Sequence, residues 1–269
     1  MSVDVDRGDT VAVVTGGGGD IGAAICRRLA DDGWTVSVCD QDLSAAESVT
    51  DGIVRAGGRA HARRLDVTDR VEMEATLGSI ADRFGGIGAL VNNVGIVGAV
   101  APLVDYPADS FDETMRINVH GVFLGLRTVL PIMIAAGAGA VVNTASTSAI
   151  RGRAHLAGYV ASKHAVLGLT KVAALEVVGT GVRVNAVLPG PIESRLIRAV
   201  NAGVGRLNAD ADADADTDTD ADAEVRRGVQ GVAYGTVDDV AATVSYLTSP
   251  DSRHLNGASI VVDGGSTIA

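Results

Sequence analysis

The sequence is poor in several residue types, and each shortage excludes a class of structure or function. Only two of the 269 residues are cysteines, which is too few for a disulfide framework or a four-ligand zinc site. Cys26 and Cys39 stand at apolar positions, so we expect both to be small buried side chains. The five histidines are scattered and form no ligand motif, so the sequence predicts no metal site.

Basic residues are also scarce, and only two of the 22 are lysines, Lys163 and Lys171. With 33 acidic residues, the formal net charge is −11. Nucleic acids and anionic membranes are recognised by clustered lysine and arginine, so we expect no nucleic-acid partner and no membrane partner. Because lysine is so rare, the place of each one in the chain is informative.

The sequence shows no run of about 18 apolar residues, which is the length that a membrane span needs. Residues 1–6 contain neither the basic nor the apolar region of a signal peptide. We therefore expect a soluble, cytoplasmic protein.

Short runs rich in valine, isoleucine and alanine alternate with longer helical stretches over most of the chain. Continuous apolar strands separated by helices are typical of a parallel sheet that is covered on both faces. With no repeat and no linker, residues 1–269 are predicted to form one α/β domain. We expect a Rossmann-type, doubly wound parallel sheet of about seven strands with helices on both faces. The expected strands are 10–15, 35–39, 60–65, 89–91, 140–144, 182–187 and 259–262.

Residues 208–224 differ from the rest of the chain because aspartate alternates there with alanine or threonine. Seven Asp and one Glu, with no basic residue, contribute −8 of the net charge. Neither face of this run has enough apolar area to bury, and Asp is a poor helix and strand former. We expect a solvated low-complexity loop. The alternative is an acidic metal-binding strip, but no glycine is present to turn the carboxylates toward one ion.

A glycine-rich turn, Thr15-Gly-Gly-Gly-Gly-Asp-Ile-Gly22, follows the first expected strand and opens the first expected helix. Such a turn brings backbone N–H groups and a helix N-terminus onto a pyrophosphate. Asp40 follows the second strand, where its carboxylate can accept both ribose hydroxyls and would repel the 2′-phosphate of NADP. NAD is therefore the predicted cofactor. The turn residues assigned to it are Gly16, Gly19, Asp20, Ile21 and Gly22.

A second group of residues carries acid–base chemistry. Tyr159 and Lys163 are four residues apart, which places them on one face of a helix. Ser146 precedes Tyr159 by 13 residues and follows the strand expected at 140–144. A free phenol has a pKa of about 10, and a neighbouring ammonium together with the cationic nicotinamide is expected to lower it. Ser146 can donate a hydrogen bond where oxyanion character develops, and Lys163 can clamp the ribose hydroxyls.

In their order and spacing, these motifs resemble the short-chain dehydrogenase/reductase family, in its compact single-domain form, over nearly the whole chain. Asn118, Ser146, Tyr159 and Lys163 match the family's catalytic tetrad. Further matches are the glycine turn, Asp66-Val67, Asn92-Asn93-Val94-Gly95, Pro189-Gly190-Pro191-Ile192 and Val262-Asp263-Gly264-Gly265. Four positions depart from the family pattern: Asp20 where glycine is usual, Val94 where alanine is usual, Ser194 in place of threonine, and Ala145 where a second serine is common. Asp20 is tolerable if it caps the start of its helix.

The resemblance implies a role for each matched residue. Tyr159 would be the general acid/base, Ser146 would polarise the substrate oxygen, and Asn118 would anchor a proton-relay water. The resemblance also implies a homotetramer, paired through the helices that carry Asn118 and Tyr159. The implied cofactor contacts are Asp66 and the Val67 backbone with adenine, Asn93 and Gly95 with the adenosine ribose, the turn at Pro189 and Gly190, and Ile192 and Ser194 with the nicotinamide carboxamide.

Residues 195–235 correspond to the family's substrate lid, which here contains the acidic run 208–224. Leu188, Leu196, Ile197 and Val200 are expected to give apolar cover to a substrate pocket bounded also by 97–100 and 149–156. The leading hypothesis is an NAD(H)-dependent oxidoreductase that interconverts a neutral secondary alcohol and a ketone. One alternative is a 3-oxoacyl thioester (acyl carrier protein) reductase, which usually prefers NADPH and a basic docking patch. Another is a non-catalytic dinucleotide sensor, which would have no need for the tetrad.

Overall fold

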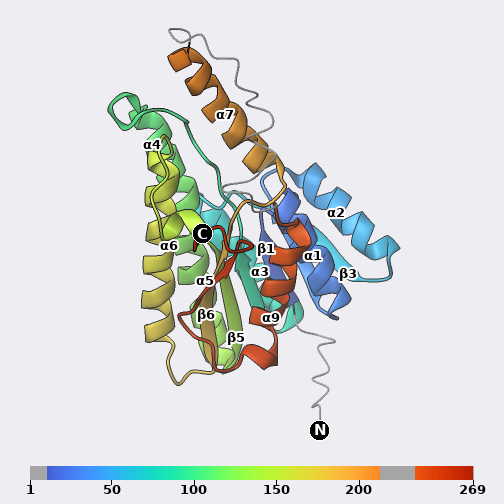
Figure 1. Ribbon diagram of the computed structural model, residues 1–269. Helices are drawn as coiled ribbons and strands as arrows, with labels where there is room; N and C mark the ends of the chain where they lie inside the picture. The colour runs from blue at the N-terminus through green and yellow to red at the C-terminus, as the bar shows by residue number, and fades with distance from the viewer. Residues whose placement is uncertain (1–10, 213–233, 269) are drawn as a thin grey trace.

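A computed structural model describes residues 11–212 and 234–268 of the chain. Seven strands form a single parallel sheet in the order β3-β2-β1-β4-β5-β6-β7, and helices cover both of its faces (Figure 1). This arrangement confirms the predicted doubly wound Rossmann-type sheet. The strands are β1 (Val11–Thr15), β2 (Thr35–Asp40), β3 (Arg59–Arg64), β4 (Ala89–Asn92), β5 (Gly139–Thr144), β6 (Val182–Pro189) and β7 (Ser259–Val262).

The helices form one layer on each face of the sheet. One layer contains α1 (Asp20–Asp31), α2 (Leu43–Arg55) and α9 (Val237–Thr248), and α1 and α9 pack closely against each other. The other layer contains α3 (Arg70–Phe84), α5 (Gly121–Ala136) and α6 (Ala157–Glu176). Two further α-helices of the described residues, α4 (Ala108–Met115) and α7 (Arg195–Asp212), lie at the carboxyl end of the strands (Figure 1).

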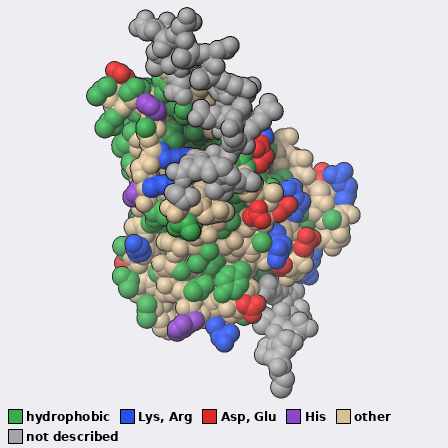
Figure 2. Space-filling view, viewed as in Figure 1, with side chains coloured by type: hydrophobic (Ala, Val, Ile, Leu, Met, Phe, Trp, Pro, Cys, Tyr) green, Lys and Arg blue, Asp and Glu red, His purple; other side chains and the backbone are tan. Residues whose placement is uncertain are grey.

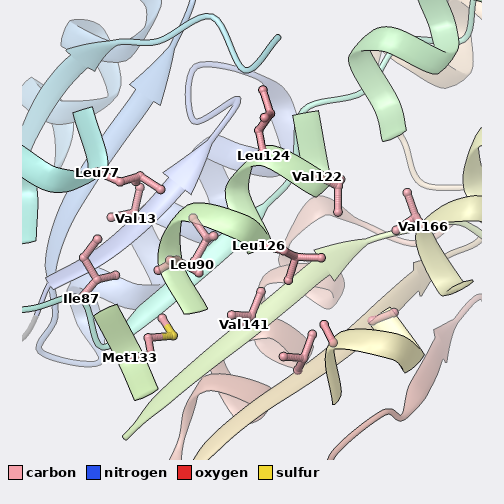
Figure 3. Packing of buried hydrophobic residues seen from close by; sticks show 14 of the residues in the cluster. Val13, Leu77, Ile87, Leu90, Val122, Leu124, Leu126, Met133, Val141 and Val166 are labelled. Carbon is pink, nitrogen blue, oxygen red and sulfur yellow. The ribbon is translucent and has the colours of Figure 1, made fainter. Parts of the chain in front are cut away.

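The central strands are buried on both faces, which explains why their sequences are continuously apolar rather than alternating. All five residues of β1 and all four of β4 are buried. Figure 3 shows Val13, Leu90 and Val141 from three neighbouring strands packing with Leu77 of α3 and Met133 of α5. Cys26 and Cys39 are free, buried thiols, as expected.

The edge strand β3 is only partly buried and carries three arginines. Charged side chains on an edge strand discourage pairing with another chain. On the face drawn in Figure 2, basic and acidic side chains are interspersed over the side of the molecule that carries α1 and α2. The described residues on this side therefore present mixed charge.

One long apolar helical stretch departs from the sequence expectation. α4, a π-helical turn (Arg116–His120) and α5 follow one another without a break from Ala108 to Ala136. By length and composition alone, this stretch is sufficient to cross a membrane, so the prediction that no such stretch exists was wrong. In the fold, α5 packs against the sheet through Val122, Leu126 and Val129. That packing accounts for the apolar residues on one side of the helix.

The acidic run begins inside a helix rather than in the predicted loop. α7 extends to Asp212, so residues 208–212 continue a helix that started at Arg195. Extending an existing helix is much less costly than starting one, which offsets the poor helix propensity of Asp. The rest of the predicted loop, 213–224, lies outside the described residues.

Candidate active site

A cavity of about 550 Å³ lies at the carboxyl ends of the parallel strands, which is where ligands bind in open α/β sheets. Residues from the glycine turn, the strand ends, α6 and α7 line it together. Its wall contains three of the four predicted catalytic residues, Ser146, Tyr159 and Lys163, but not Asn118. It also contains all the predicted cofactor residues: Gly16, Gly19, Asp20, Ile21, Gly22, Asp40, Asp66, Val67, Asn93, Gly95, Pro189, Gly190, Ile192 and Ser194.

The glycine turn fits an anionic group closely. A Cβ on Gly22 would lie 2.0 Å from the carbonyl oxygen of Gly16, whose φ is +66°, so both positions require glycine. No side chain caps the N-terminus of α1. The backbone N–H groups of Asp20, Ile21 and Gly22 have no acceptor among the described residues. These free donors at a helix N-terminus suit a pyrophosphate.

Asp40 is fixed at the end of β2 by two backbone donors. Its Oδ2 accepts from the N–H of Gly18 at 3.0 Å, and its Oδ1 accepts from the N–H of Asp42 at 3.0 Å. The carboxylate therefore lies beside the glycine turn and lines the same cavity. This is the place where a carboxylate can receive ribose hydroxyls.

Asn93 stabilises the glycine turn through two hydrogen bonds. Its backbone N–H donates to Thr15 Oγ1 at 3.1 Å, and its Nδ2 donates to the Gly16 carbonyl at 3.3 Å. Asp66, at the adenine end implied by the resemblance, accepts from the N–H and the hydroxyl of Thr68 at 2.9 and 2.7 Å. These bonds lower the pKa of Asp66, so it stays ionised at neutral pH.

Asp20 does not cap its own helix, contrary to the sequence-based suggestion. It is the first residue of α1, and its carboxylate accepts hydrogen bonds from the backbone N–H of Arg195 at 2.6 Å and from Arg195 Nε at 2.8 Å. Ser194, which was assigned to the nicotinamide, uses its hydroxyl to donate to the Ile192 carbonyl and to accept from the N–H of Ile197. Both side chains therefore help to begin α7.

The catalytic side chains come together where β5 meets α6. Tyr159 and Lys163 are both buried and lie on one face of α6, with Lys163 Nζ 5.6 Å from the centre of the Tyr159 ring. Lys163 Nζ also donates to the carbonyl of Thr144 at 2.9 Å, which holds it beneath the end of β5. Ser146 hydrogen-bonds to Tyr159 and accepts from the N–H of Ser148 at 3.1 Å.

Burial is the largest influence on the pKa values of Tyr159 and Lys163. It raises the pKa of Tyr159, while the hydrogen bond with Ser146 and the positive charge of Arg153 lower it by less. In the protein without its cofactor, Lys163 therefore does not bring the pKa of the phenol below its ordinary value, because desolvation disfavours the phenolate. The predicted lowering, which also depends on the cationic nicotinamide, stays a prediction. Burial also lowers the pKa of Lys163 to about 8.

Asn118 lies behind the cavity wall, in the π-helical turn between α4 and α5. It is fully buried, and its Oδ1 accepts from the N–H of Ile96 at 2.8 Å. Its Nδ2 donates to the Ile96 carbonyl at 2.8 Å and to Ser162 Oγ at 2.9 Å. Asn118 thus ties the loop after β4 to the catalytic helix α6.

Comparison with known proteins agrees with this geometry. The family model for the short chain dehydrogenases matches residues 10–205. The chain belongs to the short-chain dehydrogenase/reductase family. It is 35% identical to levodione reductase from Leifsonia aquatica over 97% of this chain and 95% of that protein. It is 34% identical to cyclohexanol dehydrogenase from Acinetobacter sp. (strain SE19), over 96% and 94% of the two chains.

Solved structures give the same result. The crystal structure of an NAD+-bound xylitol dehydrogenase superimposes on this short-chain dehydrogenase with a TM-score of 0.87, at 32% identity and over 96% and 99% of the two chains. Related structures carry NAD+, NADH or NADP. The described residues of this protein therefore have the fold and the dinucleotide cavity of a nicotinamide-dependent oxidoreductase.

Around Leu156 and Val200, the cavity wall of this short-chain dehydrogenase is apolar. Leu156, Tyr159 and Val200 pack together with Val97 and Val100. Leu196, Ile197 and Val200 line the cavity as predicted, whereas Leu188 is fully buried in β6 and does not reach it. Sequence reasoning assigned no site role to several wall residues: Gln41, Thr68, Ile96, Glu113, Arg116, Ile117, Thr144 and Arg195. Asp20 is a carboxylate at a position where the family usually has glycine, and this was the feature of the sequence that could have indicated a basic partner such as Arg195.

Proposed function

We propose that this protein is an NAD(H)-dependent oxidoreductase that interconverts a secondary alcohol and a ketone, with Tyr159 as the general acid/base. The observation that carries the proposal is that Ser146, Tyr159 and Lys163 line the same cavity as Asp40 and the uncapped N-terminus of α1. Levodione reductase and cyclohexanol dehydrogenase, whose names describe ketone and alcohol chemistry, support it.

The nicotinamide cofactor would supply the acceptor or donor of hydride at the carbinol carbon. Tyr159 exchanges the proton of the substrate oxygen. Ser146, whose single O–H lies beside Tyr159 in the protein without substrate, would turn that O–H to the substrate oxygen and stabilise its negative charge. Lys163 holds positive charge below the phenol ring, and Asn118 fixes the loop and helix that frame it. The apolar residues of α7 exclude water from the reacting atoms.

Asp40 supports NAD over NADP. A second negative charge at the 2′ position would lie against a carboxylate that two backbone N–H groups hold in place. We expect kcat/KM with NAD+ to exceed that with NADP+ by at least about tenfold, which corresponds to about 1.4 kcal/mol. Equal efficiency with both cofactors would contradict the assignment of Asp40.

A panel of secondary alcohols with NAD+, and the matching ketones with NADH, tests the activity directly. The panel should include cyclohexanol, open-chain diols and aromatic carbinols, because the apolar end of the cavity accepts a compact ring or chain. We expect turnover of at least one class. Tight NADH binding without turnover of any of them would contradict the proposed function.

We also propose that the protein is a cytoplasmic homotetramer. Several large apolar side chains on the outer sides of α5 and α6 are exposed, among them Phe123, Val172 and Leu175, which is 75% exposed. Pairing of these helices between subunits would cover them. Native mass spectrometry tests the assembly, and a monomer would contradict it. Cell fractionation tests the location.

A further inference from the structure

Arg153 stands apart from the other basic residues of the cavity wall. Arg116 donates to Thr68, Lys163 to the Thr144 carbonyl, and Arg195 to Asp20. Arg153 lines the same cavity but has no hydrogen-bond or ion-pair partner among the described residues. The other described arginines without a polar partner, Arg27, Arg83, Arg206 and Arg253, are all exposed, whereas Arg153 is partly buried.

The surroundings of Arg153 do not compensate its charge. The guanidinium lies in the electrostatic field of Arg151, which repels it, and of the phenols of Tyr159 and Tyr234. Arg151 itself is held by the carbonyl of Ser266 at 2.9 Å. Removal of Arg153 from water lowers its pKa, since burial disfavours the charged form. A partly buried guanidinium remains charged, and leaving it without a hydrogen-bond acceptor costs free energy.

The position of Arg153 relates it to substrate rather than to cofactor. It lies in the segment between Ser146 and Tyr159, close to Leu156, whose apolar cluster with Tyr159 and Val200 forms the wall under α7. The phosphate turn and Asp40 belong to other elements, α1 and β2. A group bound by Arg153 would therefore be part of the molecule whose hydroxyl or carbonyl meets Tyr159.

We propose that Arg153 binds an oxyanion group of the substrate, so that this enzyme acts on a secondary alcohol or ketone that also carries a carboxylate or a similar anion. The planar guanidinium presents two parallel N–H donors, which match the two oxygens of a carboxylate. The apolar cluster packs against the carbon skeleton between the anion and the carbinol carbon. This inference rests on the proposed alcohol–ketone activity, and it replaces the neutral substrate expected from the sequence.

Isosteric ligands test the proposal without turnover. Binding of cyclohexanecarboxylate and of the neutral cyclohexanecarboxamide to the enzyme–NADH complex is measured by calorimetry. We expect the wild-type protein to bind the carboxylate more tightly, and Arg153→Gln to remove the preference, a change of about 10- to 100-fold. Arg153→Lys keeps the positive charge but loses the two parallel N–H donors, so it should retain part of the preference for the carboxylate. The matched control is Arg206→Gln, which removes an exposed charge from α7.

Turnover gives the second readout. The kcat/KM values for 3-hydroxycyclohexanecarboxylate, cyclohexanol and 1,3-cyclohexanediol are compared in the wild type and in Arg153→Gln. Preference for the acid in the wild type alone supports the proposal. Equal use of the acid and cyclohexanol, or a preference for the diol that Arg153→Gln abolishes, overturns it. Carboxylate-selective binding without turnover of any alcohol would overturn the proposed function but not the anion site.

Discussion

The carboxylate of Asp20 accepts two hydrogen bonds from Arg195, a residue 175 positions later in the chain. These bonds join the first residue of α1, at the glycine turn, to the first residue of α7, which lines the same cavity. Arg195 therefore balances a negative charge that would otherwise lie beside the free N–H groups of the glycine turn. It also attaches α7 to that turn.

Loss of Arg195 should weaken cofactor binding. In Arg195→Gln the charge of Asp20 is unbalanced, and we expect NADH affinity to fall by a few-fold and not more than about tenfold, because the pair is partly exposed. Asp20→Asn in the same chain should restore the affinity. NADH fluorescence titrations measure both. Arg198→Gln, which breaks a similar exposed pair with Glu193, is the control and should have no effect. A double variant weaker than Arg195→Gln would contradict this role.

Tyr159→Phe separates an enzyme from a dinucleotide sensor. Removal of the phenolic oxygen should lower kcat by at least about 100-fold, which is the usual contribution of a general acid/base. NADH binding should stay within about twofold, since the ring still fills its buried position. Tyr246→Phe, an exposed residue of α9, serves as the control. Unchanged turnover in Tyr159→Phe would remove Tyr159 from the proposed chemistry.

The two-lysine composition allows a direct measurement of the Lys163 pKa. Lysine-selective isotope labelling should give two side-chain NMR signals, with Lys163 titrating near pH 8 and the exposed Lys171 serving as the reference. Because the unfolded chain holds this proton up to about pH 10.5, it binds more protons than the native state between pH 8 and 10.5. This group alone therefore makes stability rise with pH in that window. A Lys163 signal that does not titrate until near pH 10.5 would contradict the effect of burial.

Gly22→Ala should abolish dinucleotide binding, because its Cβ would lie 2.0 Å from the Gly16 carbonyl oxygen and displace the turn. Gly78→Ala is the matched control in α3, where the new Cβ would meet nothing within 4 Å apart from the backbone of its own helix and its chain neighbours. The control should bind NADH normally and be slightly more stable, since alanine favours helix by about 1 kcal/mol. Normal NADH binding by Gly22→Ala would show that the turn tolerates a side chain.

Local sequence signals were sufficient for the strands and the glycine turn. A strand such as β1 is buried on both faces, so its continuous apolar run predicts a strand without knowledge of the elements beside it. Strand ends were less predictable: β6 extends to Pro189 because that residue pairs with Val262 of β7. The partner of Asp20 and the pKa of Tyr159 were not predictable, since both depend on contacts made only in the folded chain.

The all-parallel sheet has a further consequence, for how the chain reaches this structure. Among the described residues no strand pair is a local hairpin: the closest pairs, β1 with β2 and β2 with β3, align Val11 with Thr35 and Thr35 with Arg59. β1 also pairs with β4, where Ala12 aligns with Ala89. Such distant pairings make folding slow. During synthesis the outer edge of β6 remains unpaired until residues 259–262 emerge, because β7 alone covers it. For that interval the nascent chain exposes an apolar strand edge, the kind of surface through which unfinished chains associate.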